Sequence, residues 1–289
     1  MSEHIRFVGE QRARLGESPV WDGAHGHLWF VDSIGGRVAA CDEHGATRAD
    51  WPFDGTIGSI GLAGNGLVAA MEDGFHRIDM NGRTRPLAHV GGGPTLRFND
   101  GKMDRVGRFL AGQLERSPGP TPTAALWRLD ANGITRLEGE LRLVNAICFS
   151  PTGDTLYFAD SLEGTIRIHD YGPDGMPGVR RGTIDCRPWG SGPDGATVDR
   201  DGNIWVALVL AQCIVCVSPD GRQLRRVQLP IPYPACPAFG GPDLATLFVT
   251  TIADSGHRLR SDHPDAGRLI AIEGLGVRGV AEACWSSHA

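Results

Sequence analysis

The chain has 289 residues, of which 41% are hydrophobic, so it is long enough to bury a sizeable core. Its formal net charge of -6 gives no reason to expect nucleic acid or an anionic membrane as a partner. It contains no apolar run of about 18 residues and no basic segment leading into an apolar one at its start, so we expect neither a membrane span nor a secretion signal. A cytoplasmic protein is the simplest expectation.

Short apolar runs that follow Gly- or Asp-containing turns recur along the chain. They carry the aromatic and aliphatic residues that are typical of strands. Their spacing is roughly 40–50 residues, which is the repeat length of four-stranded propeller blades. In chain order the six runs span residues 27–32, 66–71, 108–112, 155–160, 203–207 and 246–250.

Each run is followed by a second strand-like stretch, and the first five of these stretches lead into a turn. The chain has 41 glycines and 19 prolines, which favours turns over long helices. Residues 5–8 alternate as a strand does, and we expect them to complete the last blade beside the C-terminal strands and so close the ring. The prediction is an all-β, six-bladed β-propeller with four antiparallel strands per blade, forming one domain over residues 1–289.

Two segments, 115–123 and 253–266, are longer than a turn requires. Long irregular loops on a rigid scaffold are usually functional or disordered. We expect both to border the mouth of the central channel, with Trp189, Tyr233 and His257 at the entrance.

Polar side chains stand about 10–12 residues ahead of four of the six runs. Equivalent positions of every blade face the same central axis, so these side chains are expected to meet at one mouth. Two acids and two amides make an oxygen-rich site of the kind that hard divalent cations prefer. The four residues are Glu17, Asn99, Asn145 and Asp194.

Each of these residues also has a simpler interpretation when taken alone. Asn99-Asp100-Gly101 and Pro193-Asp194-Gly195 are ordinary turn sequences. The repeated offset favours a shared site over four unrelated turns. We do not expect Cys213 and Cys216 to form a metal-binding or redox pair, because strand positions three apart point to opposite faces. Both cysteines are predicted to be core residues.

At these positions the chain resembles the family of gluconolactonase, regucalcin (senescence marker protein) and luciferin-regenerating enzyme. The resemblance runs nearly end to end. It rests on residues 15–21, 97–102, 145 with 149–151 and 156–161, 193–195, and 238–243.

The resemblance implies a propeller that holds one divalent cation, which in this family is calcium, zinc, manganese, magnesium or iron(II). It implies that Glu17, Asn145 and Asp194 are the metal ligands and that Asp194 is also the catalytic base. Arg97 and Asn99 match substrate-binding positions, and Glu115 is a candidate for a further substrate contact. The chain departs from the family pattern at Ala146, where glycine is usual.

The function predicted from this resemblance is metal-dependent hydrolysis of a small sugar lactone to the aldonic acid. The metal would polarise the lactone carbonyl and Asp194 would take a proton from the attacking water. Three alternatives stay open: a calcium-binding regulatory protein without catalysis, an interaction platform, and an esterase for non-sugar lactones or organophosphates. We expect a small-molecule lactone as the partner, and a monomer or small homo-oligomer.

Overall fold

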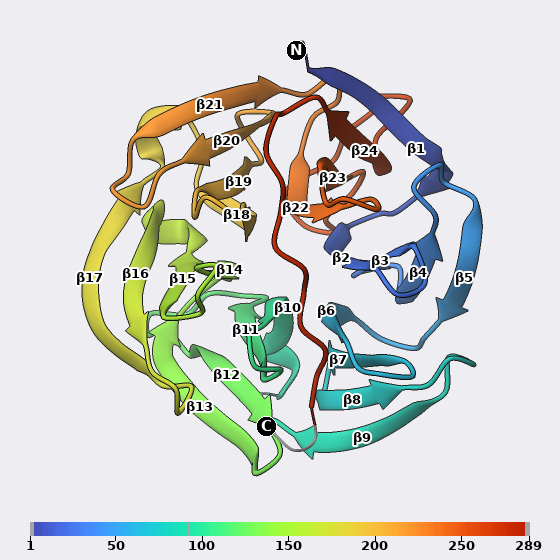
Figure 1. Ribbon diagram of the computed structural model, residues 1–289. Coiled ribbons are helices and arrows are strands. Elements are labelled where there is room, and N and C mark those ends of the chain that lie inside the picture. The colour runs from blue at the N-terminus through green and yellow to red at the C-terminus, as the bar shows by residue number, and fades with distance from the viewer. Residues whose placement is uncertain (1–2, 92, 287–289) are drawn as a thin grey trace.

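A computed structural model describes residues 3–91 and 93–286. The chain forms six four-stranded antiparallel sheets arranged in a ring around a central axis (Figure 1). In each of the first five blades the strands follow chain order from the channel outward. The predicted six-bladed propeller is therefore confirmed.

The strands of blades one to three are β2 (Gly16–Asp22), β3 (His27–Asp32), β4 (Arg37–Cys41), β5 (Thr47–Pro52), β6 (Ile57–Leu62), β7 (Leu67–Met71), β8 (Gly74–Ile78), β9 (Thr84–His89), β10 (Leu96–Met103), β11 (Phe109–Glu115), β12 (Ala124–Asp130) and β13 (Gly133–Leu141). Those of blades four and five are β14 (Val144–Phe149), β15 (Thr155–Asp160), β16 (Thr165–Tyr171), β17 (Pro177–Asp185), β18 (Pro193–Val198), β19 (Ile204–Leu208), β20 (Cys213–Val217) and β21 (Gln223–Gln228).

Helix is limited, within the described residues, to three single turns of 3-10 helix: η1 (Gly93–Thr95), η2 (Ser161–Glu163) and η3 (Arg187–Trp189). In that part of the chain, none of the helices has the length and apolar character needed to span a membrane.

The sixth blade joins the two ends of the chain. It contains β22 (Pro234–Gly240), β23 (Thr246–Thr251), β24 (Arg268–Glu273) and, outermost, β1 (His4–Arg12). Strand β1 is antiparallel to β24 and pairs Ile5 with Ile272. This closure, predicted for residues 5–8, leaves the ring without a gap between its first and last blades.

The hydrophobic core consists of layers between neighbouring blades. Strand β20 shows this well, because its two faces pack into different layers. Cys213 lies in the layer shared with blade four, and Cys216 lies in the layer shared with blade six. Both are buried free thiols, as predicted.

The innermost strand of every blade carries a β-bulge near the same end of the channel. The register shifts lie at 17/20, 57/59, 98/101, 145/148, 193/196 and 234/237. A bulge bends its strand and re-aims side chains, and bulges are frequent beside active sites. The six bulges therefore mark the mouth of the channel.

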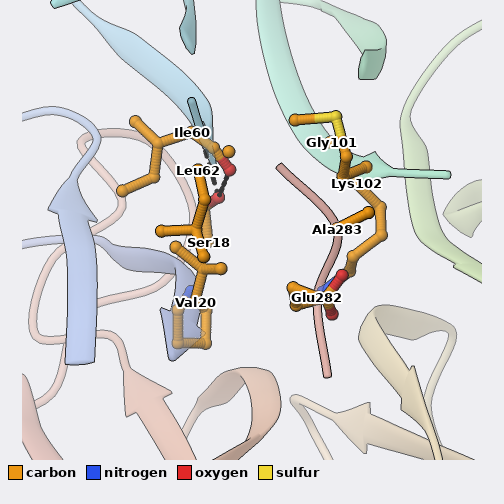
Figure 2. A pocket seen from close by; sticks show the side chains of 11 residues that line it. Ser18, Val20, Ile60, Leu62, Gly101, Lys102, Glu282 and Ala283 are labelled. Carbon is orange, nitrogen blue, oxygen red and sulfur yellow. Dashed lines mark hydrogen bonds and ion pairs between the residues drawn. The ribbon is translucent and has the colours of Figure 1, made fainter. Parts of the chain in front are cut away.

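The opposite end of the channel is crossed by the C-terminal segment 274–286 (Figure 1). The N–H groups of Gly279 and Trp285 donate to the carbonyls of Leu244, 2.8 Å away, and Leu62, 2.6 Å away. In Figure 2, Glu282 of this segment points towards Lys102 of β10, and the Nζ and Oε1 atoms are 3.8 Å apart. Segment 274–286 thus bridges blades six and two across the far end of the channel.

Candidate active site

The residues predicted from the repeat offset line one cavity. It lies at the bulged end of the channel, and its volume is about 540 Å³, within the range of small-molecule sites. All six candidates contribute to its wall: Glu17, Arg97, Asn99, Glu115, Asn145 and Asp194.

The bulges aim the candidate ligands towards this cavity. Glu17, Asn145 and Asp194 are each the second residue of an innermost strand, at or beside its register shift. Ser18 and Ala146, which follow two of them, have φ angles of 48° and 54°. Left-handed backbone is most easily adopted by glycine, which gives a physical reason for the family's usual glycine at position 146.

A series of hydrogen bonds through two amide side chains and a serine hydroxyl connects three neighbouring blades. Asn99 Nδ2 donates to Asn145 Oδ1 over 2.6 Å, and Asn145 Nδ2 donates to Ser161 Oγ over 2.9 Å. Ser161 Oγ then donates to the carbonyl of Pro193 over 2.6 Å. The amide oxygen of Asn145 is therefore held in one orientation. Ser161 belonged to a resembling segment, but no sequence signal assigned it this role.

The two candidate carboxylates are buried without a direct ion-pair partner among the described residues. Glu17 is 8% exposed and Asp194 is 9% exposed, and neither forms an ion pair within the described part of the chain. Burial raises the pKa of Asp194 to about 8, and the charge of Asp100 adds to this rise. Burial, followed by the charge of Asp194, raises the pKa of Glu17 well above its usual range. The pair is costly when ionised unless a cation lies nearby.

The donor set fits a hard divalent cation. It offers two carboxylates and one amide oxygen, all from rigid strands, and oxygen ligands are those that calcium and magnesium prefer. No group of three or more His, Cys, Asp or Glu within residues 3–91 and 93–286 is placed to hold a metal. The mixed set of Glu17, Asn145 and Asp194 is therefore the candidate.

Arg97 brings a positive charge to the same cavity. Its Nη1 donates to the carbonyl of Phe98 over 2.9 Å, to Asn99 Oδ1 over 3.2 Å and to Ser33 Oγ over 3.4 Å. Burial lowers the pKa of the Arg97 guanidinium to about 10, although the nearby Glu17 opposes that shift. At neutral pH Arg97 is a fixed cation beside the carboxylates.

Comparison with known proteins places the chain in a family. The profile described as "SMP-30/Gluconolactonase/LRE-like region" matches residues 15–253. The chain belongs to this family.

Two curated relatives match this member of the SMP-30/gluconolactonase family over almost its whole length. The chain is 32% identical to a 6-deoxy-6-sulfogluconolactonase of Pseudomonas putida, over 98% of each chain. It is 31% identical to the regucalcin of Xenopus laevis, over 96% of each chain. Among solved structures, a calcium-binding protein, regucalcin, from Agrobacterium tumefaciens has a TM-score of 0.90 and 26% identity over 97% of each chain.

In this member of the family, Glu115 lines the cavity but its carboxylate is already engaged. Oε1 accepts from the N–H and the hydroxyl of Thr123, each over 2.7 Å, and Oε2 accepts from Arg142 Nη1 over 2.9 Å. Glu115 therefore closes the loop 115–123 against the cavity wall.

Both predicted long loops border the cavity, and Pro118 and His257 are among its lining residues. The expectation was wrong for Trp189 and Tyr233. Within the described residues neither side chain is part of the lining: Trp189 packs against the layer between blades four and five, and Tyr233 packs behind the apolar cluster of Leu15, Val209 and Ile252 that lines the cavity. The reason is that an aromatic ring in a loop can bury more area against a neighbouring blade than at an open entrance.

Asp100 is a buried residue of the site region that sequence reasoning assigned only to a turn. Its two oxygens accept the N–H groups of Gly101 and Ile147, each over 2.8 Å. Burial raises the pKa of Asp100 to about 6, and Lys102 opposes this rise. Asp100 thus ties β10 to β14 directly beneath Asn99 and Asn145.

Proposed function

We propose that the protein is a metal-dependent lactonase that opens a small sugar lactone to the aldonic acid. The observation that carries this proposal is the meeting of two buried carboxylates, neither of them in a direct ion pair among the described residues, with an amide oxygen and an arginine in one cavity. Membership of the family and a relative named as a sulfogluconolactonase support the reaction class.

Glu17, Asn145 and Asp194 would hold the cation. A divalent ion bound there would polarise the lactone carbonyl and stabilise negative charge on its oxygen. Three protein ligands leave further positions free for water and substrate. The donor set suits calcium, magnesium or manganese, and zinc and iron(II) also accept oxygen ligands.

The chain's own groups would orient the substrate and move the proton. Asp194 would accept a proton from the attacking water and return it to the ring oxygen that leaves as the new hydroxyl. Arg97 and Asn99 would hydrogen-bond the substrate's hydroxyl or carbonyl oxygens. Glu115 would contribute by holding loop 115–123 in place beside the bound lactone.

Calcium binding without catalysis is the second candidate function. The same three ligands would serve it, and two similar proteins are named regucalcin, one of them described as calcium-binding. The two functions differ in turnover alone, so an activity assay separates them.

The test is a panel of aldonolactones assayed with several divalent metals. We expect metal-stimulated hydrolysis, and a loss of at least about a hundredfold in Asp194→Asn, the low end of a positioned base's contribution. Asp201→Asn, an exposed acid in the turn between β18 and β19, is the matched control and should retain activity. Metal binding without hydrolysis of any lactone would favour the calcium-binding function.

A further inference from the structure

The cavity wall carries more positive than negative charge. Four arginines and three acids line it: Arg97, Arg116, Arg142, Arg258, Glu17, Glu115 and Asp194. Which of the arginines are paired with acids determines whether the cavity can bind an anionic ligand.

One of the three acids has an ion-pair partner in the site, and the other two are the proposed metal ligands. Glu115 is paired with Arg142, whose guanidinium also donates to the carbonyls of Gly119 and Pro120. Glu17 and Asp194 would be balanced by the divalent cation of the proposed function. The surplus positive charge therefore belongs to the remaining arginines, 97, 116 and 258.

Arg116 is only partly neutralised. Its Nη2 lies 2.6 Å from Glu72 Oε1, but Glu72 does not line the cavity in the described part of the chain. Its Nε atom is buried and has no hydrogen-bond partner within residues 3–91 and 93–286. Arg116 thus keeps an unused donor beside the cavity.

Arg258 is exposed in the loop 253–266 and forms no ion pair with any residue that the structure describes. The loop is fixed by Ser255, whose hydroxyl accepts the N–H groups of Arg258, over 3.2 Å, and Leu259, over 2.9 Å. Leu259 and Ile34 pack on the same hydrophobic cluster. The buried members of this cluster come from blades five and six and from Leu15, and Gly256 of the loop lies beside Ile34, so the loop borders the cavity where blade six meets blade one.

Arg97 reaches the same side, because its Nη1 lies 3.4 Å from Ser33 Oγ, next to Ile34. Arg116 approaches the adjoining blade through Thr56, whose hydroxyl lies 3.4 Å from its Nη2. Arg97 and Arg116 thus share the wall formed by blades one to three, and loop 253–266, which carries Arg258, meets this wall at Ile34.

A sector with three guanidinium groups, of which Arg116 is paired outside the cavity lining and Arg258 forms no ion pair within the described residues, suits an anion. Guanidinium presents a planar fork that matches carboxylate, phosphate or sulfonate oxygens, and a cleft of one charge sign concentrates ligands of the opposite sign. We propose that the lactone bears an anionic substituent away from its reacting carbonyl, and that Arg116 and Arg258 bind this substituent. The inference rests on the proposed function for the reacting end of the substrate.

The test compares glucono-lactone with its 6-phosphate, its 6-deoxy-6-sulfonate and the corresponding 6-carboxylate. We expect kcat/KM to be at least about fivefold higher for an anionic lactone, and the advantage to shrink with added salt. The three anionic arms identify which oxyanion the sector prefers. Arg258→Gln should lower the anionic-to-neutral ratio three- to tenfold, roughly the effect of one partly screened charge. Arg260→Gln, an arginine of the same loop that is not among the described lining residues, should leave the ratio unchanged.

The outcomes separate the two proposals. Hydrolysis of the neutral lactone with no anionic advantage, or with a ratio that Arg258→Gln does not change, overturns the anion site and leaves the lactonase intact. If no lactone is hydrolysed, the lactonase proposal fails, and calorimetry with gluconate and 6-phosphogluconate on the metal-loaded protein decides the anion site. Tighter binding of the phosphate, weakened by Arg258→Gln, supports the site; equal affinities reject it.

Discussion

Asn99 Nδ2 lies 2.6 Å from Asn145 Oδ1 and 3.1 Å from the carbonyl oxygen of Val144, so this one amide joins the third and fourth blades at the candidate metal site. Asn145 Nδ2 is at the same time bound to Ser161 Oγ, so both ends of the amide have partners. Such outer hydrogen bonds fix the orientation of a ligand and tune its affinity for the metal.

Ser161→Ala should weaken metal binding about tenfold, the low end of what loss of a supporting hydrogen bond costs a metal site. The substitution removes one of the two side-chain partners that orient the Asn145 amide and leaves the carbonyl of Pro193 without this donor. Titration calorimetry with calcium, magnesium, manganese and zinc measures the affinity. Ser161→Thr keeps the hydroxyl and should restore binding; an alanine variant with unchanged affinity would show that Ser161 does not position Asn145.

The stability of the metal-free protein should fall as pH rises from about 4 to about 8. The pKa of Asp194 is raised to about 8 in the folded protein, against about 3.9 in an unfolded chain, so the folded state binds more protons between these values. The contribution of the protonated Asp194 carboxyl to the free energy of unfolding is complete below its pKa in the unfolded chain. It is lost as the pH rises through its pKa in the folded protein. The raised pKa of Glu17 acts in the same direction.

Bound metal should remove most of this dependence, because it holds both carboxylates ionised in the folded state. Metal affinity should rise over the same pH range, since the ligands must lose their protons. Chemical unfolding at several pH values, with and without metal, measures both effects. Equal pH dependence in the two series would argue against Glu17 and Asp194 as ligands.

Glu282→Gln should reduce the free energy of unfolding by about 3 kcal/mol, as expected when one partner of a buried ion pair is removed. Lys102 Nζ and Glu282 Oε1 are 3.8 Å apart, and the two side chains are 9% and 12% exposed. The variant leaves the Lys102 ammonium buried without its partner. The double variant Lys102→Met, Glu282→Leu should recover most of the loss, because an apolar pair needs no charge compensation. Denaturant unfolding of the three proteins provides the measurement.

Glu115→Ala should raise KM more than it lowers kcat. Both oxygens of Glu115 bind the chain, so the variant should release loop 115–123 from the cavity wall without touching the ligands. Limited proteolysis should show faster cleavage within residues 116–122. Thr123→Val removes only the hydroxyl contact and should have a smaller effect. A large fall in kcat with an unchanged loop would instead indicate that Glu115 contacts the reacting lactone.

Local patterns sufficed to predict the blades, because the alternation of strand residues and the chemistry of turns act over a few positions. The repeat also predicted that Glu17, Asn99, Asn145 and Asp194 would line one mouth, since a ring places equivalent positions around a single axis. The pairing of β1 with β24 followed from the same logic, because an unclosed ring would leave two exposed edges.

Only the tertiary structure decided where the polar side chains point and which groups they contact. The bulges that turn the candidate ligands inward depend on how each innermost strand pairs with the next strand of its blade. No pattern in the sequence predicted them. Glu115 meets Arg142, and Lys102 meets Glu282, across stretches of chain that have no local relationship. Strand periodicity specifies which face a residue occupies, whereas the charge that it meets depends on segments that only folding brings together.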